Sequence, residues 1–307
     1  MKVLLIWLGK MGQFHLQNLL NINSIEHIYA FDVFPETFKI SSTKITYSTQ
    51  LEDFDTKDFD FVDIVAPTKF HFLYLEKYIR MKKNIFVEKP IVGNKEEIEK
   101  LEAIIQQEDY NGKIGVGFIE RFNVVSKFLK EELTKRGNPE QIEFFRYNPA
   151  STRIWDTGVT EDLMIHDIDL VQAFFENTPI HVVWKNINSD TATALLKADT
   201  TNIILSANRI TQQKIREIKI YYQDVTIIWD LILWKIEFFH KPETYLSQKW
   251  QDLSISYLVD ERVLIKNNQL KEELEEFCTI IHGWERKNVA DYASSVNGFR
   301  VLENILQ

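Results

Sequence analysis

The chain has 307 residues and carries 36 Lys and Arg against 45 Asp and Glu, a formal net charge of −9 with histidine neutral. A mildly acidic chain is a poor candidate for binding nucleic acid, whose phosphates are recognised by clustered Lys and Arg. No apolar run reaches the roughly 18 residues that a membrane span needs, and the run at 3–8 is shorter than a signal-peptide core. Cys278 is the single cysteine, so an intramolecular disulfide is excluded. We therefore expect a cytoplasmic protein with no nucleic-acid or membrane partner.

Short apolar runs and helix-like segments alternate through the first 120 residues. The runs are rich in Val, Ile and Leu without a period of two, as expected of strands buried on both faces. We expect strands at 2–8, 28–31, 61–66, 84–87 and 114–118, and helices around 15–20, 70–81 and 96–107. This β-α-β alternation predicts a doubly wound parallel sheet with right-handed crossovers.

The pattern changes after residue 120. We expect helices at 124–136, 159–175, 272–281 and 290–306, a strand at 142–147, and mostly strands from 180 to 239. Within that last stretch apolar residues alternate with polar ones, most clearly at 214–222, which favours an antiparallel or mixed sheet. The fold class is therefore α/β, with a first domain at 1–120 and a second α+β domain at 121–307 carrying a mostly antiparallel open sheet.

A glycine-containing turn, Trp7-Leu8-Gly9-Lys10-Met11-Gly12, joins the first expected strand to the first helix. A dinucleotide fingerprint would read G-x-G-x-x-G here, followed by a helix whose first N–H groups bind phosphate. Gly9 and Gly12 can fill the second and third glycine positions, with Lys10 and Met11 between them. Trp7 occupies the first position. By itself the motif is equally compatible with a plain tight turn.

Asp32 closes the second expected strand 20 residues after Gly12. A carboxylate at this place typically accepts hydrogen bonds from the adenosine ribose hydroxyls and repels a 2′-phosphate. No arginine follows it closely, so NAD is favoured over NADP as the cofactor. The alternative interpretation of Asp32 is an exposed carboxylate at a strand end.

A Glu-Lys-Pro motif ends a buried strand at Val87-Glu88-Lys89-Pro90. Together with the segments 67–71, 117–123, 156–169 and 274–277, it resembles the Gfo/Idh/MocA oxidoreductases, and the similarity covers nearly the whole chain. The resemblance implies an N-terminal Rossmann domain and an NAD-dependent dehydrogenase acting on CH–OH groups.

The resemblance also implies the catalytic residues. Lys89 would lie beside the nicotinamide and bind the reacting hydroxyl, His166 would be the general base, and Asp162, four residues earlier on one helix face, its partner. The residues alone favour a buried hydrogen-bonded histidine and a helix N-terminal acid. A metal site at His166 is not expected, because its acidic neighbours cannot converge on one ion from a regular helix. Further expected cofactor contacts are Pro67, Thr68, His71 and Glu88.

The substrate is expected to be a sugar. Arg121, Asn123 and Arg153 look most like the branch that acts on nucleotide sugars, such as UDP-N-acetylglucosamine 3-dehydrogenases. Arg153 can bind a diphosphate bidentately or form a salt bridge with a carboxylate; the sequence leaves both open.

The leading hypothesis is therefore an NAD-dependent sugar or nucleotide-sugar dehydrogenase that forms a homodimer or homotetramer. One alternative is a catalytically silent NAD-binding sensor, motivated by Trp7. Another is a related reductase acting on a non-sugar carbonyl or imine.

Overall fold

The computed structural model describes residues 1–149, 158–240 and 258–307. The chain forms two compact units: unit 1 comprises residues 1–122 and 268–300, and unit 2 comprises residues 123–267 and 301–307. The sequence assigned 121–307 to one domain, whereas residues 268–300 group with the N-terminal unit. The chain thus leaves unit 1 after Phe122 and returns to it at Asn268.

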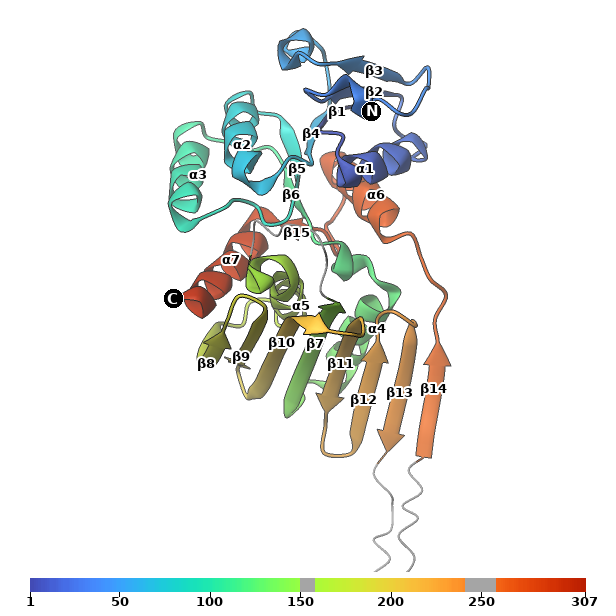
Figure 1. The fold of residues 1–307 in the computed structure, drawn as a ribbon, viewed down its shortest axis with the longest axis vertical. Helices are drawn as coiled ribbons and strands as arrows, with labels where there is room; N and C mark the ends of the chain where they lie inside the picture. The colour runs from blue at the N-terminus through green and yellow to red at the C-terminus, as the bar shows by residue number, and fades with distance from the viewer. Residues whose placement is uncertain (150–157, 241–257) are drawn as a thin grey trace, which may run out of the picture. The chain divides into compact units, whose positions relative to one another are not determined.

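Unit 1 contains a seven-stranded sheet of order β15-β6-β5-β4-β1-β2-β3 (Figure 1). Neighbouring strands pair in parallel except β15, which is antiparallel to β6. This confirms the predicted doubly wound sheet. The strands are β1 (Lys2–Ile6), β2 (His27–Phe31), β3 (Ile45–Ser48), β4 (Phe61–Ile64), β5 (Asn84–Glu88), β6 (Ile114–Gly117) and β15 (Ala290–Asp291).

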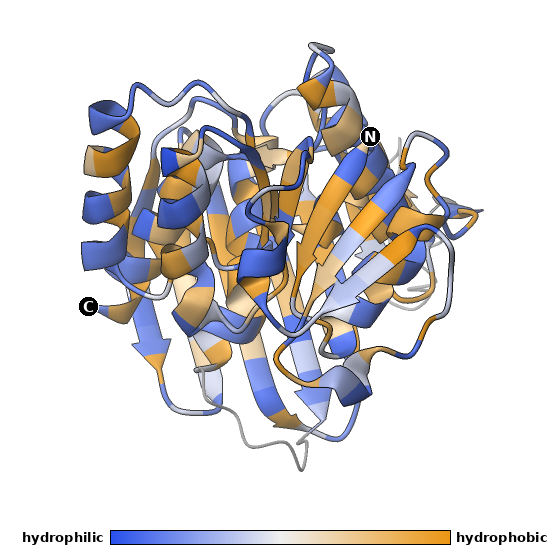
Figure 2. Ribbon diagram, turned by 90° about the horizontal axis from the view of Figure 1, so that it is seen from above, coloured by the Kyte–Doolittle hydropathy of each residue, from blue (hydrophilic) through white to orange (hydrophobic). Residues whose placement is uncertain are grey.

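The helices of unit 1 are amphipathic and cover both faces of this sheet. In Figure 1, α2 and α3 lie on one side of the sheet and α1 and α6 on the other, and Figure 2 shows helices with one hydrophobic and one hydrophilic side. They are α1 (Lys10–Leu20), α2 (His71–Arg80), α3 (Lys95–Gln107) and α6 (Gln269–Ile281), and α7 (Tyr292–Leu306) begins in this unit. No helix within the described ranges is long and apolar enough to cross a membrane.

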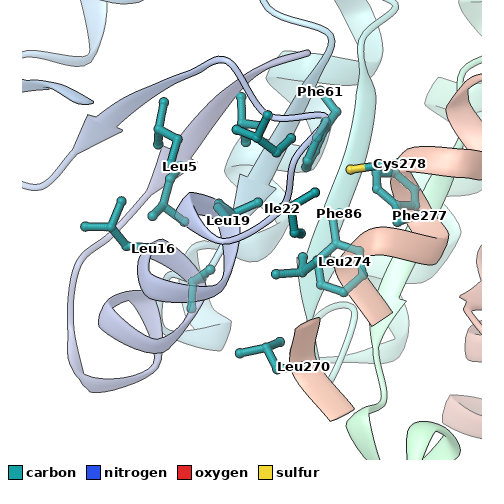
Figure 3. Packing of buried hydrophobic residues seen from close by; sticks show 14 of the residues in the cluster. Leu5, Leu16, Leu19, Ile22, Phe61, Phe86, Leu270, Leu274, Phe277 and Cys278 are labelled. Carbon is teal, nitrogen blue, oxygen red and sulfur yellow. The ribbon is translucent and has the colours of Figure 1, made fainter. Parts of the chain in front are cut away.

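Residues 268–300 group with unit 1 because α6 completes its hydrophobic core. Phe277 of α6 packs edge-on against both Phe61 of β4 and Phe86 of β5, with ring centroids 5.4 Å apart in each pair. Leu270 and Leu274 of the same helix join the cluster (Figure 3). Burying each such side chain contributes about 1.5–3 kcal/mol, so α6 is an integral part of this unit.

Unit 2 is an eight-stranded sheet of order β14-β13-β12-β11-β7-β10-β9-β8. Its neighbours pair antiparallel except β7 and β10, which are parallel. The predicted mostly antiparallel sheet is thereby confirmed. The strands are β7 (Gln141–Pro149), β8 (Ile180–Ile187), β9 (Thr191–Ala198), β10 (Thr201–Thr211), β11 (Ile215–Tyr221), β12 (Val225–Asp230), β13 (Lys235–His240) and β14 (Leu258–Val263).

Two helices, α4 (Val124–Arg136) and α5 (Ile165–Phe174), pack on one face of this sheet. Phe128 of α4 meets Trp229 of β12, and Phe174 of α5 stacks on Phe144 of β7. Immediately before α5 the backbone forms a π-helical turn over Thr160–Met164, where the sequence predicted one regular helix. Such π turns are rare and frequently mark functional sites.

Candidate functional site

The first position of the glycine turn has a backbone conformation that favours glycine, although the residue there is Trp7. Its φ is 78°, in the left-handed region, which costs a residue with a Cβ about 1–2 kcal/mol. Gly12 permits the tight turn, because any residue with a Cβ at this position would place that atom 2.0 Å from the Trp7 carbonyl oxygen. The turn therefore keeps the shape of the fingerprint with a tryptophan in its first glycine position.

The Trp7 side chain leaves the turn toward the start of α2. Its ring stacks on Phe70 with centroids 5.4 Å apart and planes 22° from parallel, and its indole N–H donates to the Tyr74 hydroxyl at 3.2 Å. The sequence did not show where this side chain could go. The structure places it against Phe70 and Tyr74.

The start of α1 fits a dinucleotide phosphate. A Cβ built on Gly9 would meet no described atom within 4 Å, and no side chain among the described residues caps the helix. Backbone N–H groups in the first turn, which includes Lys10 and Met11, are then available to phosphate oxygens. The residues present thus suit the group that the fingerprint predicts.

Asp32 is buried at the end of β2, with 1% of its surface exposed, so the interpretation as an exposed carboxylate is wrong. Its Oδ2 accepts the Leu8 N–H at 2.7 Å and its Oδ1 accepts the Phe34 N–H at 3.0 Å. The carboxylate thereby ties the glycine turn to β2. A carboxylate has about four lone-pair positions, so two contacts leave acceptor capacity for a ribose; that role stays a prediction.

Gln13 of α1 is a further residue of this region that the sequence did not single out. Its amide donates to the Leu8 carbonyl at 2.9 Å and to the Thr37 carbonyl at 2.7 Å. These bonds connect the glycine turn with the 3₁₀ turn at Pro35–Thr37. A glutamine on a helix carries no sequence signal for such a bridge.

Pro67 and Thr68 follow β4, where Pro67 precedes a 3₁₀ turn over Thr68–Phe70. His71, at the start of α2, is 1% exposed and contacts two carbonyl oxygens, those of Ala66 and Pro90, each at 2.8 Å. Burial lowers the pKa of His71, while the hydrogen bonds to these two carbonyl oxygens act in the opposite direction. His71 therefore links the segments after β4 and β5, and its ring nitrogens already face protein carbonyls.

Lys89 follows directly on β5 at the carboxyl end of the parallel sheet, where ligands bind in doubly wound folds. Its backbone N–H donates to Oε2 of Glu88 at 3.1 Å, and the Lys89–Pro90 peptide is cis. Gly117 of β6 leaves room for that carboxylate, since a Cβ there would lie 3.0 Å from Glu88 Oε1. The Glu88 side chain thus forms a hydrogen bond with the backbone of Lys89.

A buried charge cluster that the sequence did not predict lies behind Glu88. His15 of α1 is fully buried, with Nδ1 2.8 Å from Asp63 Oδ2 and Nε2 3.1 Å from Glu88 Oε1. Burial alone would lower the pKa of His15, but the charge of Asp63 and the hydrogen bonds to both carboxylates raise it to about 10. Burial raises the pKa of Asp63. An aspartate within the otherwise apolar strand β4 was the available signal.

Arg121 and Asn123, predicted to contact substrate, are both buried. Arg121 lies in the 3₁₀ turn Ile119–Phe122, with its guanidinium 3.4 Å from the Asn288 carbonyl. Asn123 is the N-cap of α4: its Oδ1 accepts the Val125 N–H at 3.0 Å, as capping asparagines do. The structure therefore gives Asn123 a structural role, and the substrate contacts of both residues stay predictions.

Asp162 lies in the π-helical turn and His166 in the first turn of α5. Arg209 of β10, 5% exposed, donates to the Gly158 carbonyl at 2.8 Å and lies 3.4 Å from Asp162 Oδ2. The sequence did not single out this arginine. It anchors the start of the turn that carries Asp162, while the pairing of Asp162 with His166 stays a prediction.

The acidic neighbour of His166 has a separate role. Asp167 Oδ1 accepts hydrogen bonds from Arg146 of β7, at 2.9 Å from Nε and 2.7 Å from Nη2, and both residues are 2% exposed. This pair fixes α5 to the centre of the sheet.

Arg153, the remaining predicted site residue, lies outside the described residues. Lys89 belongs to unit 1, whereas Asp162 and His166 belong to unit 2. The structure therefore establishes the surroundings of these three residues separately.

Unit 1 has the features of a dinucleotide-binding domain: a mostly parallel sheet, a tight glycine turn at the start of α1, and a carboxylate closing β2. Residues 1–118 match the family described as "Oxidoreductase family, NAD-binding Rossmann fold". This is the family that the sequence motifs resemble.

Relatives extend the similarity over the rest of the chain. The UDP-N-acetylglucosamine 3-dehydrogenase of Acidithiobacillus ferrooxidans is 26% identical over 319 aligned residues, covering 100% of this chain and 96% of the relative. An inositol 2-dehydrogenase of Rhizobium meliloti is 24% identical over 58% of this chain and 56% of its own length.

Solved structures share the fold. That of the Acidithiobacillus ferrooxidans dehydrogenase matches with a TM-score of 0.79 at 24% identity, covering 100% of this chain and 96% of the other. A scyllo-inositol dehydrogenase from Lactobacillus casei, solved with bound NAD(H) and scyllo-inositol, matches with a TM-score of 0.73 at 22% identity, covering 99% and 95%.

Proposed function

We propose that this chain is an NAD-dependent dehydrogenase that transfers a hydride between a hydroxyl-bearing sugar carbon and the nicotinamide. The observation that carries the proposal is the position of Lys89 at the carboxyl end of the same parallel sheet whose first turn fits a dinucleotide. A nucleotide sugar is the favoured substrate, because a relative named for UDP-N-acetylglucosamine aligns over the whole chain.

The proposed cofactor is NAD rather than NADP. Asp32 places a carboxylate at the end of β2, and apolar Val33 and Phe34 follow it. An anion there repels a 2′-phosphate, and neither following residue offers a positive charge to bind one. When bound, NAD supplies the hydride acceptor for sugar oxidation.

The chain's own residues would manage the hydroxyl proton. Lys89 donates a hydrogen bond to the reacting oxygen and stabilises negative charge that develops on it. An imidazole nitrogen of His166 accepts the hydroxyl proton as the hydride leaves the same carbon. Asp162 stabilises the imidazolium that results, and Arg209 fixes the turn that carries Asp162.

The activity test is oxidation of a panel of UDP-sugars and free sugars, followed as NADH absorbance. Lys89→Ala and His166→Ala should each lower kcat/KM by at least about 100-fold, the usual size of a general acid–base contribution, with NADH affinity largely retained. Wild-type turnover of a carbonyl or imine substrate, with none of any sugar, would favour the reductase alternative. Tight cofactor binding without turnover of any of these would favour the silent sensor.

The cofactor test is binding of NADH and NADPH, measured by energy transfer from tryptophan to the nicotinamide. Wild type should bind NADH more tightly, and Asp32→Asn should narrow that preference by about tenfold as the repelling charge is removed. Asp60→Asn is the matched control, because Asp60 also accepts a backbone N–H, that of Lys2, at the opposite end of the sheet. If wild type binds NADH and NADPH with equal affinity, the assignment of NAD as the cofactor is wrong.

The proposal includes a homodimer or homotetramer that forms through the open sheet of unit 2. Val183 and Trp184 of its edge strand β8 are 58% and 53% exposed. Light scattering coupled to size exclusion measures the number of subunits directly. A monomer at micromolar concentration would contradict this part of the proposal.

A further inference from the structure

The cluster of His15, Asp63 and Glu88 brings three ionisable groups together inside unit 1. His15 and Asp63 are fully buried, and 14% of the Glu88 side chain is exposed. Both ring nitrogens of His15 face carboxylate oxygens, so with ionised partners the ring must be doubly protonated to donate to both. Asp63 Oδ1 accepts no hydrogen bond within the described part of the chain.

The net charge of the cluster does not depend on which atom holds the shared proton. An imidazolium between two carboxylates has a formal charge of +1 − 2 = −1. If the proton moves from His15 to Asp63, the ring and Asp63 are neutral and Glu88 keeps its charge, so the sum is again −1. A charge buried this deeply is screened little by solvent.

The partly exposed member of the cluster, Glu88, lies at the edge of the sheet where the proposed cofactor site is. Glu88 is the last residue of β5, and its other carboxylate oxygen holds the N–H of Lys89. Burial lowers the pKa of His71, which links the segments following β4 and β5, and so disfavours a positive charge on its ring. Lys89 is the cation nearest in sequence, and its charge is common to wild type and to the Glu88 variants, so it does not contribute to a difference between them.

We propose that the His15–Asp63–Glu88 cluster shifts the binding preference of the cofactor site toward the oxidised dinucleotide. The nicotinamide ring is a cation in NAD⁺ and neutral once it has received a hydride, so a fixed negative charge nearby stabilises only the oxidised form. The bound reduced cofactor then becomes a stronger hydride donor. This inference rests on the proposed cofactor site but not on the identity of the sugar.

The experiment is equilibrium binding of NAD⁺ and NADH to the full chain, which needs no substrate. Glu88→Gln keeps the shape and removes the charge, so the ratio Kd(NAD⁺)/Kd(NADH) should rise by about three- to tenfold, the Coulomb effect of one charge several ångströms away. Asp63→Asn removes a charge farther from the strand end and should raise the ratio by less. Glu88→Asp keeps the charge and should leave the ratio within about twofold of wild type.

Controls separate charge from structural damage. Glu97→Gln removes a carboxylate that accepts the Gly93 N–H outside the cluster and should leave the ratio unchanged. A folded Glu88→Gln variant that weakens both Kd values equally would overturn the inference while the proposed function stands. If wild type binds neither form, both are overturned. If sugars are not oxidised but the ratio moves as expected, only the proposed activity fails.

Discussion

Trp7 shows how one residue can keep a backbone conformation that its side chain disfavours. Trp7 has a φ of 78°, and its carbonyl oxygen lies so close to Gly12 that a Cβ there would be only 2.0 Å away. The stacked Phe70 and the hydroxyl of Tyr74 hold the indole. Trp7 therefore combines an unfavourable backbone conformation with favourable side-chain packing, and substitutions can measure the two contributions separately.

We expect Trp7→Ala to be less stable than Trp7→Gly by about 1 kcal/mol, because alanine keeps the strained φ and glycine adopts it freely. Both should be less stable than wild type by about 2–4 kcal/mol, since both lose the packing of the indole. Urea unfolding measures these differences. An alanine variant as stable as the glycine variant would show that the backbone relaxes.

At the scale of elements, α4 begins with a residue for which two roles are in competition. Asn123 caps α4, and the sequence also predicted that it contacts substrate. We expect Asn123→Ala to lower the free energy of unfolding by about 1 kcal/mol, and Asn123→Ser, which can cap, to restore most of it. A serine variant with normal thermal stability but a raised KM for the sugar would establish the substrate contact as well.

The His15 cluster joins three elements, α1, β4 and β5, through one shared proton. The folded-state pKa of His15, about 10, lies above its usual 6.5. The stability that this protonation contributes is therefore fully present below pH 6.5 and lost as the pH rises toward 10. We expect the free energy of unfolding of wild type to fall by one to a few kcal/mol across that window.

The corresponding measurement is urea unfolding at a series of pH values, with His15→Asn as the comparison. The variant lacks the titrating ring, so its unfolding free energy should change less between pH 6.5 and 10. Parallel pH profiles for the two proteins would rule out His15 as the source of the loss.

At the scale of the whole molecule, the packing of Phe277 of α6 depends on the absence of a side chain at Gly115, which is far away in the sequence. A Cβ added at Gly115 of β6 would lie 2.7 Å from the Phe277 ring. We expect Gly115→Ala to destabilise the protein by about 1–3 kcal/mol. Phe277→Leu should cost less in that background than in wild type, because the smaller side chain relieves the clash. Chemical denaturation of the four proteins of this cycle tests the coupling, and strict additivity would contradict it.

The sequence predicted the elements that local pattern determines. Unbroken apolar runs marked the strands of unit 1, and the period of two marked the sheet of unit 2. It missed β3 (Ile45–Ser48), which has four residues and only partial burial, and β14 (Leu258–Val263), which lies beyond the stretch predicted to be strands. It also missed the partners of His15 and Arg209 and the grouping of α6 with unit 1, because these depend on contacts between residues distant along the chain. The glycine turn was predictable because its spacing is local, whereas Lys89 was singled out by the resemblance of its Glu-Lys-Pro motif to a known family.

Because α6 belongs to unit 1, the hydrophobic core of this unit stays incomplete during much of the synthesis of the chain. Phe61 and Phe86 are synthesised early, but the helix that covers them is complete only at Ile281. Between Phe122 and Ile281 lie about 160 residues, which take roughly 8–30 seconds at synthesis rates of about 5–20 residues per second. Throughout that interval the nascent sheet exposes aromatic side chains that α6 later covers, and such transiently exposed apolar surface favours aggregation.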